Sequence, residues 1–289
     1  MASRIQKNSL KRRKISWCFL ILFLILIPEI GNCQDQKKWK SIEFSSWGQK
    51  GKVELGNYFV EYYMGGKTGK ERKHIWGYAL IKDKKGNILK RIEDWIVESI
   101  GWDDITGDGT TEIIITTYSG GAHCCETSYI YSLKEKLENI LIFNYMGHYN
   151  FIKEIKDLNG DGVKEIIVND GRFDYFDEFS HAGSPMFNQV LCYRDNRYRE
   201  CIKEFPEFIE KKLQELIFPE LEPIENDRLE SVIKPQVIEI YAYFILLGRE
   251  KKGWQKLMAI SPDSIKTWLI KYRKEIIEEM KGELPITYE

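Results

Sequence analysis

Asp104-Ile-Thr-Gly-Asp108-Gly-Thr-Thr-Glu112-Ile-Ile114 recurs later in the chain as Asp157-Leu-Asn-Gly-Asp161-Gly-Val-Lys-Glu165-Ile-Ile167. Seven of the eleven aligned positions are identical, and every position with an oxygen-bearing side chain in this D-x-[TN]-x-D-G-x-x-E pattern corresponds. In a tight loop, side chains at positions one, three and five point to a common centre, glycine allows the bend, and a later carboxylate closes the shell. Hard oxygen ligands in this number favour calcium over magnesium, which retains more water. The predicted ligands are Asp104, Thr106, Asp108 and Glu112 in the first loop, and Asp157, Asn159, Asp161 and Glu165 in the second.

The two segments differ from EF-hands in their flanks and in their last ligand. Position twelve, where an EF-hand has a bidentate glutamate, is Ile115 in the first copy and Val168 in the second. Strand-like rather than helical residues flank both copies, which predicts calcium-type loops joining β-strands. Two alternatives remain: plain hairpin turns without an ion, and a catalytic use of the acidic residues.

Around these loops the chain has a strand-like pattern as far as about residue 203. Short β-branched and aromatic runs at 58–63, 74–81, 112–118 and 128–133 are separated by Gly and Asp turns, and Gly86 lies at a predicted hairpin tip. The hydrophobic content of 43% is sufficient for a packed core and excludes a disordered chain. We therefore predict an α+β protein with a mostly antiparallel β domain at residues 34–203, either a partial propeller or a sandwich.

Residues 204–289 have a helical period and form the predicted C-terminal helical region. Apolar residues from Phe205 onward share one stripe, and the segment 237–247 is apolar nearly all round, which predicts a buried helix after Pro235 that ends at Gly248. Ser261 is the predicted N-cap of the last helix, with Pro262 at its first position. The acidic, proline-flanked stretch 219–235 reads as a surface connection. A unit this small buries too little surface to be stable alone, so we expect it to pack on the sheet.

The first 33 residues have the pattern of an export signal. Basic residues up to Lys14 precede a 14-residue apolar run, which is shorter than the roughly 20 residues of a membrane-spanning helix. The segment Ile30-Gly-Asn-Cys33 resembles a lipoprotein signal, which makes Cys33 a lipidation candidate; plain cleavage near Cys33 is the alternative. Without this segment the chain is mildly acidic, which argues against a nucleic-acid partner. We expect an exported bacterial protein, periplasmic or anchored in the cell envelope, that meets the membrane only through this possible lipid.

Four further cysteines suit an oxidising compartment, and disulfide candidates are therefore Cys124, Cys125, Cys192 and Cys201. A two-residue turn at Asn196-Arg197 would place Cys192 opposite Cys201, which leaves a strained bond between the adjacent Cys124 and Cys125. Two long bridges between the pairs are the alternative, and the sequence does not choose. His123 beside Cys124 and Cys125 also permits a thiol nucleophile with its base, although neighbours on a strand point to opposite faces.

With these motifs, the chain resembles FG-GAP or VCBS repeat proteins, and more closely a group of uncharacterised exported bacterial proteins that carry such repeats. The resemblance covers roughly residues 95–280 and includes the segments 118–125, 174–185 and 192–198. It implies structural calcium at both acidic loops and an integrin-like β architecture, and it implies no activity.

These observations predict a non-enzymatic envelope protein, in which a calcium-stabilised β domain presents loops to a protein or glycan ligand. The sequence contains no Walker, Rossmann, G-x-S-x-G or H-E-x-x-H motif. The alternative is an envelope enzyme, a hydrolase or thiol protein, that uses His123 with Cys124 or Cys125.

Overall fold

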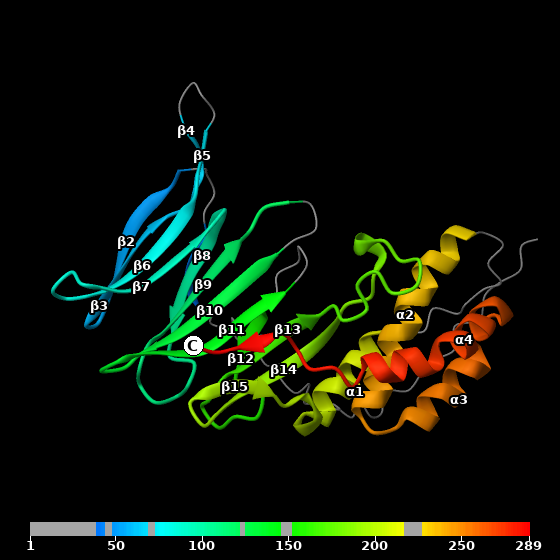
Figure 1. The fold of residues 1–289 in the computed structure, drawn as a ribbon. Helices are drawn as coiled ribbons and strands as arrows, with labels where there is room; N and C mark the ends of the chain where they lie inside the picture. Colours follow the sequence, from blue (N-terminus) through cyan, green and yellow to red (C-terminus); the bar gives the residue numbers. More distant parts are fainter. Residues whose placement is uncertain (1–38, 44–47, 69–72, 122–124, 146–151, 217–226) are drawn as a thin grey trace, which may run out of the picture. The chain divides into compact units, whose positions relative to one another are not determined.

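A computed structural model describes residues 39–289, apart from 44–47, 69–72, 122–124, 146–151 and 217–226. The predicted export segment and Cys33 lie outside the described residues. Trp39–Glu289 forms one compact unit. Antiparallel sheets make up most of it and helices follow, so the predicted α+β class is confirmed (Figure 1).

The described strands form three larger antiparallel sheets. The first sheet contains β2 (Lys50–Leu55), β3 (Tyr58–Tyr63), β6 (Gly77–Asp83) and β7 (Ile88–Asp94). The second contains β1 (Lys40–Glu43), β8 (Ile96–Asp103), β9 (Glu112–Tyr118), β10 (Glu126–Leu133), β11 (Leu137–Tyr145) and β16 (Ile286–Thr287). The third contains β12 (Ile152–Lys156), β13 (Glu165–Asp170), β14 (Phe187–Arg194) and β15 (Arg197–Glu200). A separate hairpin is formed by β4 (Gly66–Thr68) and β5 (Lys73–Ile75).

The three sheets stack face to face, because residues of the second sheet enter two different cores. In β9, Ile113 and Ile115 pack with the first sheet, whereas Ile114 packs with the third. Both faces of this central sheet are therefore buried, which explains why β9 reads as a continuous apolar run. The stack has one sheet more than a two-sheet sandwich.

Charged side chains cover the outer face of the first sheet. Phe59 of β3 lies between two lysines of the neighbouring strands. Lys52 Nζ of β2 lies 3.9 Å from the centre of the Phe59 ring, and Lys82 Nζ of β6 lies 5.8 Å from the same centre. Lys82 also pairs with Glu61. Long basic side chains thus shield the aromatic surface with their aliphatic stems and cation–π contacts.

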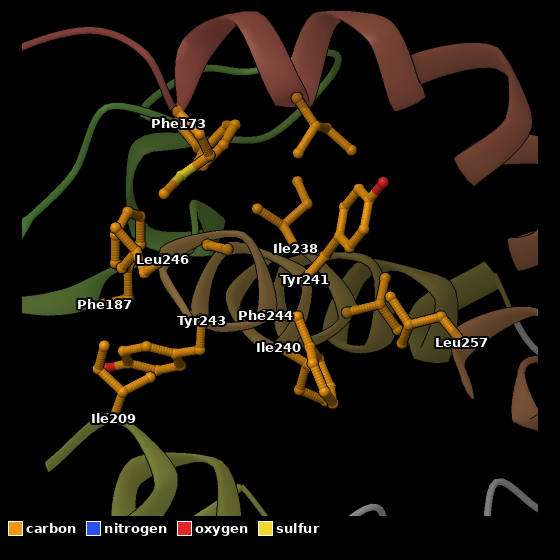
Figure 2. Packing of buried hydrophobic residues seen from close by; sticks show 14 of the residues in the cluster. Phe173, Phe187, Ile209, Ile238, Ile240, Tyr241, Tyr243, Phe244, Leu246 and Leu257 are labelled. Carbon is orange, nitrogen blue, oxygen red and sulfur yellow. The ribbon is translucent and has the colours of Figure 1, made fainter. Parts of the chain in front are cut away.

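At the other end of the stack, the helices of the described C-terminal region follow the third sheet, and the prediction that this region packs on the sheet is confirmed. They are α1 (Pro206–Glu215), α2 (Asp227–Leu246), α3 (Glu250–Ile260) and α4 (Asp263–Glu279). Phe187 and Val190 of β14 share a core with α2 and α4. Figure 2 shows side chains leaving α2 in several directions, with Tyr243 directed toward Phe187 and Ile209. The nearly all-apolar segment 237–247 has no exposed residue, so it is covered on all sides as its composition requires.

Three local predictions were wrong. The helix expected to begin after Pro235 begins at Asp227, so Pro235 lies inside α2, and the expected surface connection is partly helical. Tertiary packing of α2 outweighs the backbone hydrogen bond that proline cannot donate. In α4 the N-cap is Pro262, not Ser261, and no side chain caps the helix.

The third wrong prediction was the strand at 74–81, which is divided into β5 and β6 at Trp76. A Cβ on Gly77 would lie 2.3 Å from the carbonyl oxygen of Met64, the residue that follows β3. The strand is therefore interrupted where its backbone approaches the end of β3 closely.

Candidate functional site

The two acidic segments form equivalent hairpin loops in neighbouring sheets. The first loop joins β8 to β9, and Asp103 pairs with Glu112 where it closes. The second loop joins β12 to β13, and Lys156 pairs with Glu165 at the same position. Both are therefore loops of equal length between antiparallel strands, as predicted.

In the first loop, the carboxylates accept hydrogen bonds from the loop's own amides. Asp104 accepts the N–H groups of Gly107 at 2.8 Å and Gly109 at 3.0 Å. Glu112 is fully buried and accepts the N–H of Ile105 at 3.0 Å, the N–H of Thr106 at 3.2 Å and the Ser132 hydroxyl at 2.8 Å. Burial raises the pKa of Glu112, although these hydrogen bonds favour its charged form.

The second loop repeats this arrangement. Asp157 accepts the N–H groups of Gly160 at 2.6 Å and Gly162 at 2.9 Å, and buried Glu165 accepts the N–H of Leu158 at 2.8 Å. Burial also raises the pKa of Glu165. The same sequence spacing thus produces the same main hydrogen bonds twice: two glycine amides bind the first aspartate, and the glutamate binds an amide at the start of its loop.

The donor chemistry fits a hard cation at each loop, but the residues do not form a ready-made metal cluster. No group of three or more His, Cys, Asp or Glu side chains suited to a metal occurs among the described residues. Thr106 Oγ1, at the third ligand position, is buried and has no hydrogen-bond partner within the described part of the chain. A carboxylate oxygen that accepts one N–H keeps a second lone pair, so the paired aspartates of each loop can still ligate calcium.

One contact distinguishes the two loops. Lys134 Nζ lies 3.1 Å from Asp108 Oδ2 in the first loop. Burial would raise the pKa of Asp108, but the Thr110 N–H and this ammonium outweigh it and lower the pKa to about 2. In the second loop, the corresponding Asp161 is approached by the neutral Asn159 amide, 2.9 Å away. The ammonium group of Lys134 therefore already places a positive charge, here called the tethered cation, at the first loop.

The two loops also contact each other across the boundary between the second and third sheets. The Lys164 N–H donates to the Ile105 carbonyl oxygen at 2.9 Å. A Cβ added to Gly107, which has a φ of +73°, would lie only 2.7 Å from the Gly162 carbonyl oxygen. Lys164 Nζ lies 2.5 Å from Asp103 Oδ2. The loops thus form one paired structure, here called the loop pair (residues 103–112 and 156–165).

Tyr198 of β15 joins the two halves of the loop pair. Its side chain is fully buried, and its hydroxyl lies 3.2 Å from the Ile105 carbonyl oxygen and 3.0 Å from the Lys164 carbonyl oxygen. Burial, together with the nearby Glu112 and Glu165 carboxylates, raises the pKa of Tyr198, so the hydroxyl stays protonated and can donate. The sequence offered no signal for this role, because Tyr198 is distant from both loops along the chain.

Among the predicted cysteines, Cys192 and Cys201 form a disulfide. The predicted turn at Asn196-Arg197 was wrong by one residue: Asp195 and Asn196 form it, with φ values of 51° and 62°. Cys192 therefore pairs in register with Arg199, and Cys201 follows the end of β15.

Cys125 is also disulfide-bonded. A bonded sulfur has no thiolate, which removes Cys125 as a nucleophile in this state. His123 and Cys124 lie outside the described residues.

The connection between β13 and β14 contains a carboxylate–imidazole pair that sequence reasoning missed. Asp174 Oδ2 lies 2.8 Å from His181 Nδ1, both side chains are largely buried, and the Tyr175 ring stacks on the imidazole at 5.8 Å. Tyr175 has a φ of 57°, an uncommon backbone conformation for a residue with a side chain. The pair fixes the ring orientation of His181 and stiffens this connection.

A groove of about 910 Å³ lies beside the second loop. Asn159, Asp161 and Glu165 contribute to one part of its lining, and Phe205 and Phe208 at the start of α1 contribute to another. The Arg194 guanidinium, which is paired with Glu204, also lines it. The groove thus combines a largely charged lining with an aromatic part at the start of α1.

Comparison with known proteins gives one distant similarity. The chain is 23% identical over 155 residues to a probable thylakoid lumen protein of Synechocystis sp., and the match covers 50% of this chain and 42% of that protein. The alignment thus spans less than half of the relative's length. No family profile and no solved structure matches the chain. None of the helices in the described ranges is both long and apolar enough to cross a membrane.

Proposed function

We propose that this chain is an exported bacterial cell-envelope protein whose β region is a calcium-stabilised binding module. The loop pair is the observation that carries this proposal. Two loops with the same ligand spacing and the same hydrogen bonds from glycine amides to the first aspartate meet at the junction of two sheets. Repeated carboxylates repel each other there, and calcium would neutralise them while fixing both turns. The FG-GAP or VCBS resemblance assigns calcium to the same residues.

Export is supported by three features. The N-terminal pattern is that of a secretory signal, and the distant relative is described as a protein of the thylakoid lumen, a compartment reached by translocation. The Cys192–Cys201 disulfide suits an oxidising compartment. We propose the periplasm or the cell envelope as the location, with Cys33 as the lipid attachment point.

The groove beside the second loop is the proposed binding site for a protein or glycan ligand. Its lining combines backbone turns held by the loop with the aromatic start of α1. An ion in the second loop would fix one wall of the groove, which links the structural ion to ligand binding.

Thermal melting in calcium and in chelator tests the ion. Calcium that binds the folded chain alone stabilises it by about 2.7 kcal/mol at a hundredfold excess over the dissociation constant. Asp161→Asn should remove most of the gain contributed by the second loop, because it takes away a charged ligand. The exposed Asp195, outside both loops, supplies the control Asp195→Asn, which should retain the full gain. A melting curve indifferent to both calcium and chelator would refute calcium stabilisation.

Membrane fractionation tests the anchor. Cys33→Ser should leave an uncleaved or soluble product if the cysteine carries lipid, because the thiol is the attachment point. Unchanged processing and unchanged detergent partitioning would show plain secretion instead.

A further inference from the structure

We propose that the two acidic loops bind calcium as a coupled pair, so that an ion in either loop raises the affinity of the other. This inference rests on the proposed calcium binding and adds a regulation of that site. The sequence repeat alone suggests two independent loops. The structure places them in direct contact, through groups adjacent to the predicted ligands.

The backbone contact joins the start of the first loop to the end of the second. Ile105 lies between the predicted ligands Asp104 and Thr106, and Lys164 directly precedes Glu165. The 2.9 Å hydrogen bond from the Lys164 N–H to the Ile105 carbonyl oxygen therefore connects ligand-bearing backbone on both sides. A shift of either loop on ion binding must move or strain this bond.

Tyr198 adds a second connection from outside both loops. Its hydroxyl is within hydrogen-bonding distance of the Ile105 and Lys164 carbonyl oxygens, at 3.2 Å and 3.0 Å, and water has no access to this fully buried side chain. A hydrogen bond excluded from water is strong, and the single hydroxyl proton can be shared between the two carbonyl oxygens only while both lie within its reach. Both loops must hold their positions for the hydroxyl to reach both carbonyls.

The third connection is steric. Gly107 approaches the Gly162 carbonyl oxygen so closely that even a methyl group would meet it at 2.7 Å. Gly109, in the same loop, has a similar φ of +82° but nothing within 4 Å of its added Cβ. Comparing alanine substitutions at these two glycines therefore separates the effect of backbone strain, which both cause, from the loss of loop–loop contact, which only Gly107→Ala causes.

Coupling follows from the ordering that an ion imposes. Calcium in the second loop would fix Gly162 and Lys164, and through the three contacts it would fix Ile105 and Gly107 of the first loop. The first loop then loses less conformational freedom when its own ion binds. Linkage requires that the first ion helps the second equally. Coupling that depends on a few hydrogen bonds should be about five-fold, at the lower end of the usual range.

Calorimetric titration of the full chain with calcium alone measures this coupling. Asp108→Asn leaves the second loop intact and gives its separate association constant, and Asp161→Asn gives that of the first loop. The product of the two association constants of the unchanged protein should exceed the product of these separate constants about five-fold. Adding Tyr198→Phe to all three proteins should bring the ratio close to one.

Two matched controls exclude a general effect of the substitutions. Tyr243→Phe removes a different buried hydroxyl, which accepts the Asn188 N–H at 2.9 Å in the helix-covered core, and should leave the ratio unchanged. Gly107→Ala should bring the ratio of association constants close to one. Gly109→Ala should weaken calcium binding by the first loop through backbone strain and leave this ratio at about five. If Tyr198→Phe does not fold, the two glycine variants still decide the question.

Each result has a separate meaning. Two bound ions with a ratio near one in the unchanged protein would overturn the coupling and leave calcium binding intact. A ratio that survives both Tyr198→Phe and Gly107→Ala would overturn the proposed contacts. A single bound ion that Asp108→Asn does not affect would overturn the coupled pair. No calcium-dependent heat and no thermal response would overturn the proposed function as well.

Discussion

Glu239 makes the stability of the helical region depend on pH near neutrality. This residue of α2 is partly buried, and burial raises the pKa of its carboxyl group from 4.5 to about 7. The positive charges of Lys153 and Lys212 act in the opposite direction but do not cancel the effect of burial. Above pH 7 the folded protein therefore holds a carboxylate in a place that favours the neutral acid.

The direction and size of the effect follow from proton linkage. Below pH 4.5 the group is protonated in both the folded and the unfolded chain and causes no difference. Between pH 4.5 and about 7 the folded chain binds more protons, so the free energy of unfolding falls as the pH rises. Above this range the loss is complete and amounts to at most about 3 kcal/mol.

Glu239→Gln replaces the carboxyl by a neutral group of similar shape and should abolish this dependence. Urea unfolding should give equal stability for both proteins at pH 4. At pH 8 the variant should be more stable, by up to about 3 kcal/mol, which is roughly 10 °C in melting temperature. Glu275→Gln, at an exposed position of α4, is the control and should show no pH-dependent gain. A difference between Glu239→Gln and the unchanged protein that is the same at pH 4 and pH 8 would refute this reasoning.

Three further perturbations test the rest of the structure. Replacing Cys192 and Cys201 by alanine opens a link with a sequence separation of 9 and should lower the free energy of unfolding by about 3 kcal/mol in non-reducing urea; a loss under 0.5 kcal/mol would contradict it. Lys134→Met removes the tethered cation and should raise the calcium affinity of the first loop roughly two- to five-fold by calorimetry. The control Lys136→Met, in the same turn, should leave this calcium affinity unchanged. Equal effects of the two substitutions would show that the contact between Lys134 and Asp108 does not weaken calcium binding. A fragment of residues 34–201 should aggregate in light scattering, because it exposes the helix-covered face of β14; a soluble fragment that unfolds cooperatively would contradict the packing described.

Local sequence determined the strands, the hairpin loops and most of the helical region. Asp and Gly in the acidic segments specify a turn through hydrogen bonds within a few residues, so the two loops could be recognised without tertiary information. The runs at 58–63 and 112–118 coincide with β3 and β9, because β-branched and aromatic residues between turn signals leave few alternatives. The helical stripe after Phe205 likewise gave α1.

Only the tertiary structure decided what these elements contact. Pro235 lies within α2 because burial of apolar neighbours such as Ile233 and Val237 outweighs a lost hydrogen bond. Ile286 pairs with β11 because Leu284 enters the core between the second and third sheets. Tyr198 reaches both acidic loops, although no local pattern links it to either. The physical reason is the range of the forces involved. Turn and helix preferences act within a few residues, whereas the meeting of the two loops depends on how the buried faces of two sheets fit together.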